Sequence, residues 1–69
     1  MIQTSERLTH TERTCLQLAA RGHSPDAIAE HMGGRQGIAE IQLASARKKL
    51  MASTTIEALA RALKFGLIE

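Results

Sequence analysis

With 69 residues, the chain is long enough for one small domain, residues 1–69, and too short for a second one. Aromatic residues make up only 1% of it against 43% hydrophobic residues in total, so the core must consist of aliphatic side chains. A net charge of +2 does not by itself indicate a nucleic-acid partner. No apolar run approaches the roughly 20 residues that span a bilayer, and the first residues lack the apolar core of a signal peptide. We therefore predict no membrane partner and a cytoplasmic location.

The first predicted helix covers about residues 10–21. Leu8 precedes the sequence THTE, in which Thr9 is the expected N-cap and Glu12 is expected to accept from the Thr9 amide, a capping box. Gly22 suits the position just beyond the helix. The predicted buried side repeats at helical spacing and consists of Cys15, Leu16, Leu18 and Ala19.

The second predicted helix is short, about residues 25–32. Ser24 is its expected N-cap, Pro25 suits the first helical position, and Asp26 favours the positive end of the helix dipole. Two glycines, Gly33 and Gly34, end it. Its apolar side consists of Ile28, Ala29 and Met32.

The third predicted helix covers about residues 36–51, with Gly37 in its first turn. Steps of four, three and four residues separate the members of one apolar stripe, which we expect to be buried: Ala39, Leu43, Ala46 and Leu50. The helix ends with three consecutive basic residues, so a basic patch can form there.

The fourth predicted helix covers about residues 55–65 and ends before Gly66. Ser53 or Thr54 is its N-cap, and Thr54 with Glu57 matches a second capping box. Its apolar stripe consists of Ala58, Leu59, Ala62 and Leu63. Since no segment alternates with period two, the prediction is an all-α, four-helix domain. A short helix followed by a longer basic one favours a helix-turn-helix, and a plain helical interaction bundle is the alternative.

Three motifs carry a resemblance to a known family. The sequences LTHTE, ARGHSPDAIAEHM and KKLMASTTIEALARALKFGLI are similar, without gaps from Leu8 to Ile68, to those of the LuxR/FixJ-type (GerE-like) helix-turn-helix domain. The resemblance implies the four-helix helix-turn-helix fold of that family. It also implies a transcription regulator that binds double-stranded DNA as a dimer, with the third helix in the major groove.

The departures from the family fall in one stretch, GRQGIAEIQ at 34–42, where the family usually has ISxxTVKxH. Arg35 stands in place of the serine that usually caps the recognition helix, and Glu40 stands in place of a lysine. Family resemblance implies that positions 40, 41 and 44 face base edges, and Ala44 occupies the last of them. Neither usual basic reader is present.

The predicted DNA contacts are of two kinds. Phosphate contacts are expected from Ser24, Arg35, Arg47, Lys48 and Lys49. Base-edge contacts are expected from Gln36, Glu40, Ile41, Gln42 and Ser45. Two alternatives stay open: the basic run is a solvated face, and the carboxylate of Glu40 either accepts from cytosine N4 or weakens the attraction to phosphate.

A rival function follows from the missing basic readers. The resemblance implies dimerisation through the fourth helix, with an interface that includes Thr55, Ala58, Leu59 and Ala62. The partner is a second copy or a related regulator. A domain that keeps this helix but has lost its base readers is a degenerate helix-turn-helix, an interaction or anti-activator module with weak or no DNA binding. Alternatively, Leu59 and Leu63 belong simply to the core.

Catalytic chemistry has no support in the sequence. His10, His23 and His31 are scattered and are interpreted as surface residues, so we predict no metal site. Cys15 lies on an apolar helix side without a neighbouring histidine and is interpreted as buried rather than reactive. The glycines of GGRQG lack the residues of a phosphate loop. We therefore predict neither an enzyme nor a cofactor.

Overall fold

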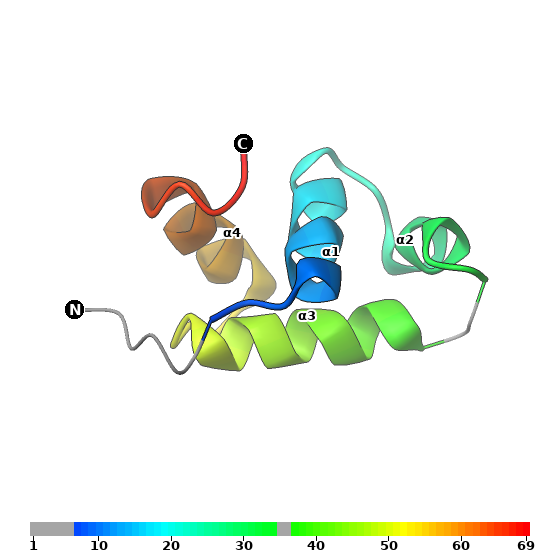
Figure 1. Cartoon of the computed structure of the whole chain (residues 1–69), viewed down its shortest axis with the longest axis horizontal. Helices are drawn as coiled ribbons and strands as arrows, with labels where there is room; N and C mark the ends of the chain where they lie inside the picture. Colours follow the sequence, from blue (N-terminus) through cyan, green and yellow to red (C-terminus); the bar gives the residue numbers. More distant parts are fainter. Residues whose placement is uncertain (1–6, 35–36) are drawn as a thin grey trace.

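The computed structural model describes residues 7–34 and 37–69, which form helices and no strand. These are α1 (His10–Ala20), α2 (Pro25–His31), α3 (Ile38–Lys49) and α4 (Thr55–Lys64). In Figure 1, α1 stands upright above α3, with α4 on one side of it and α2 on the other. The prediction of an all-α fold is confirmed for this part of the chain.

Side-chain caps start α1, α2 and α4. At α1 the capping box is confirmed, because the Thr9 hydroxyl accepts from the Glu12 amide at 3.0 Å and the Glu12 carboxylate accepts from the Thr9 amide at 2.8 Å. The hydroxyl of Ser24 accepts from the Ala27 amide at 3.2 Å, as expected. At α4 the cap is Thr54, which was one of the two candidates.

The capping box predicted for α4 is only half correct. The Thr54 hydroxyl accepts from the Glu57 amide at 3.1 Å. The Glu57 carboxylate, however, accepts from the amide of Ser53 at 2.8 Å, one residue before the cap. Both candidate residues thus contribute to the same helix start, one through its side chain and the other through its backbone.

Helix α3 is shorter at both ends than the predicted 36–51. Gly37 is its N-cap, with φ of +82°, a left-handed conformation that the first helical turn excludes, and no side chain caps this end. At the other end Met51 adopts a φ of +56°. The amides of Met51 and Ala52 donate to the carbonyls of Lys48 and Arg47, which closes the helix at Lys49.

The core is aliphatic and rich in alanine. The predicted α3 stripe of Ala39, Leu43, Ala46 and Leu50 is buried, which confirms it. Cys15, Leu16 and Ile28 are fully buried beside it. On α4 the core residues are Ala58 and Ala62, whereas Leu59 is half-buried and Leu63, predicted in the same stripe, is 50% exposed. Leu63 is therefore not a core residue.

Candidate nucleic-acid interface

The outward face of α3 lies opposite its buried stripe. With 3.6 residues per turn, Ile41, Ala44 and Lys48 occupy this face. Ile41 is 67% exposed, and Lys48 and Glu40 are exposed as well. The middle of this face is apolar, with the acidic Glu40 near its start and the basic Lys48 near its end.

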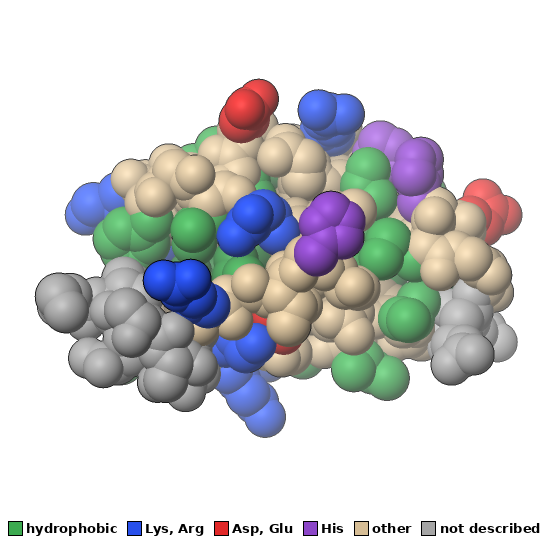
Figure 2. All heavy atoms as spheres, viewed as in Figure 1, with side chains coloured by type: hydrophobic (Ala, Val, Ile, Leu, Met, Phe, Trp, Pro, Cys, Tyr) green, Lys and Arg blue, Asp and Glu red, His purple; other side chains and the backbone are tan. Residues whose placement is uncertain are grey.

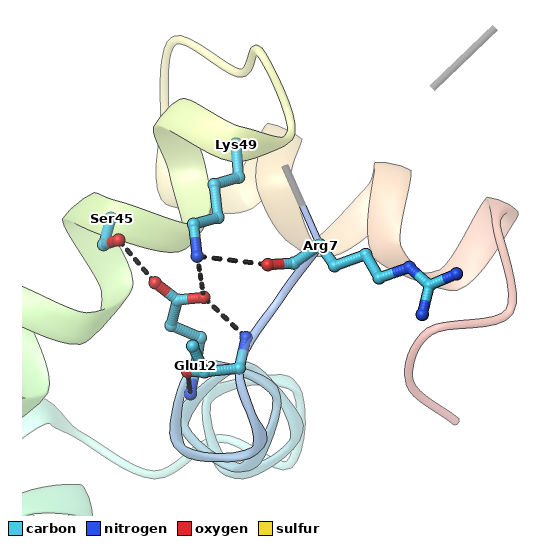
Figure 3. Close-up of polar contacts among 5 residues, drawn as sticks. Arg7, Glu12, Ser45 and Lys49 are labelled. Carbon is cyan, nitrogen blue, oxygen red and sulfur yellow. Dashed lines mark hydrogen bonds and ion pairs between the residues drawn. The ribbon is translucent and has the colours of Figure 1, made fainter. Parts of the chain in front are cut away.

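The basic run at the end of α3 is divided between different partners. Lys49 donates from Nζ to the Glu12 carboxylate at 2.9 Å and to the Arg7 carbonyl at 3.1 Å (Figure 3). The Arg47 guanidinium donates to the Ser53 carbonyl at 3.4 Å. Lys48 makes no hydrogen bond or ion pair with the described residues. Of the three residues of the basic run, Lys48 is the one whose charge faces solvent without a partner among the described residues.

Glu12 joins α1 to α3 and is 3% exposed. Besides the bond from Lys49, it accepts a hydrogen bond from the hydroxyl of Ser45, and its carboxylate lies between the two helices in Figure 3. Ser45, expected to read a base edge, thus points at an internal acceptor. Sequence reasoning assigned Glu12 only its capping role. The one feature of the sequence that indicated a buried position for Glu12 was its place beside the apolar side of an amphipathic helix.

Opposing effects act on the pKa of Glu12. Burial disfavours the carboxylate, but the hydroxyl of Ser45, the amide of Thr9 and the ammonium of Lys49 together hold the pKa below its usual value of 4.5. The group is therefore ionised at neutral pH, and its charge holds the two helices together. This Glu12 cluster, defined as Glu12 with Thr9, Ser45 and Lys49, is structural.

The start of α3 is acidic. Glu40 and Asp26 line one small cavity of about 140 Å³, together with Pro25, Gly37 and Ala39. The hydroxyl of Ser24 already accepts from a helix amide, and Asp26 lies in the same helical turn. The two carboxylates would repel a phosphate group at this end of α3.

Three further residues were predicted to contact DNA. Arg35 and Gln36 lie outside the described residues, and the side chain of Gln42 is half-buried.

The predicted dimer surface on α4 is wrong for two of its residues. Ala58 and Ala62 are fully buried by this chain's own core, so a second chain cannot contact them. Thr55 is exposed and Leu59 half-buried. The accessible apolar residues of α4 are instead Ile56, Ala60 and Leu63, which are spaced i, i+4, i+7. We call these three the α4 stripe; this spacing was visible in the sequence beside the buried one.

Large exposed side chains lie on α4 and at its two ends. Ile56 is 75% and Leu63 50% exposed, and the flanking Met51 and Phe65 are 80% and 42% exposed. Scattered exposed apolar residues are ordinary on a monomer, but Ile56 and Leu63 lie on one face of α4 with the spacing of a contact surface. The apolar surface of α4 is thus displaced by one helix position from the predicted one.

The remaining candidate residues lie away from α3. His10 is exposed, and the rings of His23 and His31 meet edge to face with centroids 5.7 Å apart, although the sequence separates them. The described residues contain no group of three or more potential metal ligands. Cys15 is fully buried, and burial, followed by the charge of Glu12, raises the pKa of its thiol. A thiolate at Cys15 is therefore disfavoured.

Comparison of the chain with protein-family models, with curated proteins and with solved structures gives no match. In the part of the chain that the structure describes, every helix is too short or too polar to cross a membrane.

Proposed function

We propose that the chain is a LuxR/FixJ-type helix-turn-helix domain of a cytoplasmic transcription regulator, in which α3 enters the major groove of DNA. The observation that carries this proposal is the exposure of Ile41 and Lys48 on the outward face of α3, opposite a buried stripe. A helix of 12 residues is about 18 Å long, and the major groove, about 12 Å wide, admits a single α-helix. The helix order, in which the short α2 is followed by the longer α3 and then by α4, also supports a helix-turn-helix domain.

The side chains of this face define an unusual way of binding. Lys48 contacts a phosphate. Arg47 has only a 3.4 Å hydrogen bond to the Ser53 carbonyl, and it exchanges this bond for a contact to a second phosphate. Ile41 packs against a thymine methyl group, and the small side chain of Ala44 permits close approach. Glu40 lowers the general attraction to the polyanion. Binding is therefore weak, its salt dependence reflects the few phosphates contacted, and two domains read half-sites about 34–36 Å apart.

Lys48→Ala tests the phosphate contact. If Lys48 neutralises one phosphate, the slope of log affinity against log salt falls by roughly one unit on every duplex sequence. The measurement is a fluorescence-anisotropy titration of random-sequence and palindromic duplexes at several salt concentrations. Lys64→Ala, an exposed lysine at the end of α4, is the matched control and leaves the slope unchanged. Equal slopes for the wild type and Lys48→Ala would exclude the contact.

A second candidate function rests on the α4 stripe. The exposed Ile56 and Leu63 favour association with a second copy or a related regulator. If α3 no longer reads DNA, such association is the whole activity, and the domain is an interaction or anti-activator module.

Ile56→Gln with Leu63→Gln tests the association. Because fully burying an aliphatic side chain contributes about 1.5–3 kcal/mol, removing two of them raises the dimer dissociation constant by about a hundredfold or more. Sedimentation equilibrium measures it, with Lys64→Gln as the control. Association that depends on the stripe without binding to any duplex favours the interaction module, whereas association and duplex binding together favour the regulator. An unchanged association constant rejects the stripe as the interface.

A further inference from the structure

The outward side of α1 carries a groove that the proposed DNA contacts and the α4 stripe do not use. It has a volume of about 390 Å³ and is lined by His10, Arg13, Thr14, Gln17, Leu18 and Arg21. All six belong to α1 or its C-cap, and the opposite side of the helix, with Cys15 and Leu16, is fully buried in the core. We call this surface the α1 groove.

The charge of the α1 groove has one sign. Arg13 and Arg21 are exposed, and neither forms an ion pair with any described residue. The one acidic residue of α1, Glu12, points the other way into the core. Figure 2 shows basic and histidine side chains over the middle of the face where Figure 1 draws α1, whereas acidic side chains lie mainly toward the rim. The groove therefore offers two solvent-exposed guanidinium groups that form no ion pair with the described residues.

One wall of the groove is held in place by the end of the chain. The Gln17 side chain donates to the Glu69 carbonyl at 2.8 Å and accepts from the Glu69 amide at 3.0 Å. This pair of bonds fixes the amide of Gln17. The Glu69 carboxylate makes no ion pair with the two arginines among the described residues.

We propose that the α1 groove docks an acidic amphipathic helix of a protein partner. Leu18, the methyl group of Thr14 and the stems of the longer side chains provide an apolar floor between the two guanidinium groups, which suits an aliphatic side chain better than a phosphate backbone. Arg13 and Arg21 are eight residues apart, about 12 Å along the helix. A partner helix with carboxylates at i and i+8 and a leucine at i+4 presents the same spacing. Arginine binds carboxylates through two parallel hydrogen bonds.

The test uses a fluorescein-labelled, alanine- and glutamine-rich helical peptide of 18 residues with glutamates at positions 5 and 13 and leucine at position 9. Anisotropy titration against the whole chain is expected to show saturable binding that weakens with salt. The double variant Arg13→Gln/Arg21→Gln is expected to lower the affinity about fivefold or more. Replacing the two glutamates of the peptide by glutamine is expected to have the same effect.

The double variant Arg7→Gln/Lys64→Gln removes the same charge elsewhere and is the control. Arg7 contacts Lys49 of the Glu12 cluster only through its backbone carbonyl, and its side chain points away from that cluster in Figure 3. Retention of peptide affinity in this control supports the α1 groove, and an equal loss in both variants overturns it. A loss of duplex affinity in Arg13→Gln/Arg21→Gln with unchanged peptide binding also overturns it, since the face is then a phosphate contact. Because this readout does not involve α3, its failure leaves the DNA proposal standing.

Discussion

Glu12→Ala is expected to destabilise the domain by about 2–4 kcal/mol, because it leaves the half-buried Lys49 ammonium without its counter-charge. It also removes the acceptor for Ser45 and half of the capping box of α1. A domain of 69 residues has roughly 3–10 kcal/mol of stability in total. Urea denaturation at pH 7 is therefore expected to find this variant close to unfolding.

The pH dependence identifies the charge as the cause. Since the folded pKa of Glu12 lies below 4.5, its stabilising contribution is fully present above the unfolded pKa and is lost as the pH falls through the folded pKa. The isosteric Glu12→Gln should be less stable than the wild type at pH 7 and should lose less stability on acidification. Glu30→Gln, at an exposed carboxylate on α2, is the matched control. Identical acid transitions in wild type and Glu12→Gln would contradict this role.

Glu40→Lys is expected to raise the affinity for random-sequence DNA about tenfold or more at low salt. The substitution turns a repelled carboxylate into a cation at the exposed start of α3, and each added phosphate contact contributes a salt-dependent term. The fold should survive, because losing an acidic residue from the first turn and gaining a basic one there each cost only about 0.3–1 kcal/mol. Anisotropy titration on duplexes measures the change, and circular dichroism checks the fold.

Two further variants assign the cause. Glu40→Gln removes the negative charge without adding a positive one and should give a smaller gain. Glu30→Lys makes the same charge change on α2, away from the outward face of α3, and should give little gain. If Glu40→Lys instead weakens binding to a preferred site, Glu40 acts there as an acceptor for cytosine N4, and base reading replaces repulsion as its role.

The helix starts and the buried stripes were predictable from sequence because they depend on local geometry. Thr9 and Glu12 are three residues apart, and so are Ser24 and the Ala27 amide, so each cap is decided within one turn. The α3 stripe follows from helical periodicity alone. At Met51 the same local reasoning failed, because the left-handed residue after a helix is usually glycine and here is methionine.

The candidate site was less predictable because its chemistry depends on residues that meet only in the fold. Ser45 and Lys49 were assigned to DNA, yet both bind Glu12, which is 33 and 37 residues away in sequence. On α4, Ala58 and Ala62 were assigned to a partner although the core had already buried them. In each case the sequence identified residues that make contacts, but it did not identify the part of the chain that they contact.

Sequence alone therefore determined the all-α class, the caps of α1 and α2 and the core stripe of α3, since each depends on contacts within a turn or on a 3.6-residue period. Only the tertiary structure decided which polar groups remain free. It paired Lys49 with Glu12 and left Lys48, Arg13 and Arg21 without ion pairs among the described residues. The physical reason is that burial and charge pairing are set by the packing of helices against one another, and no local pattern records that packing.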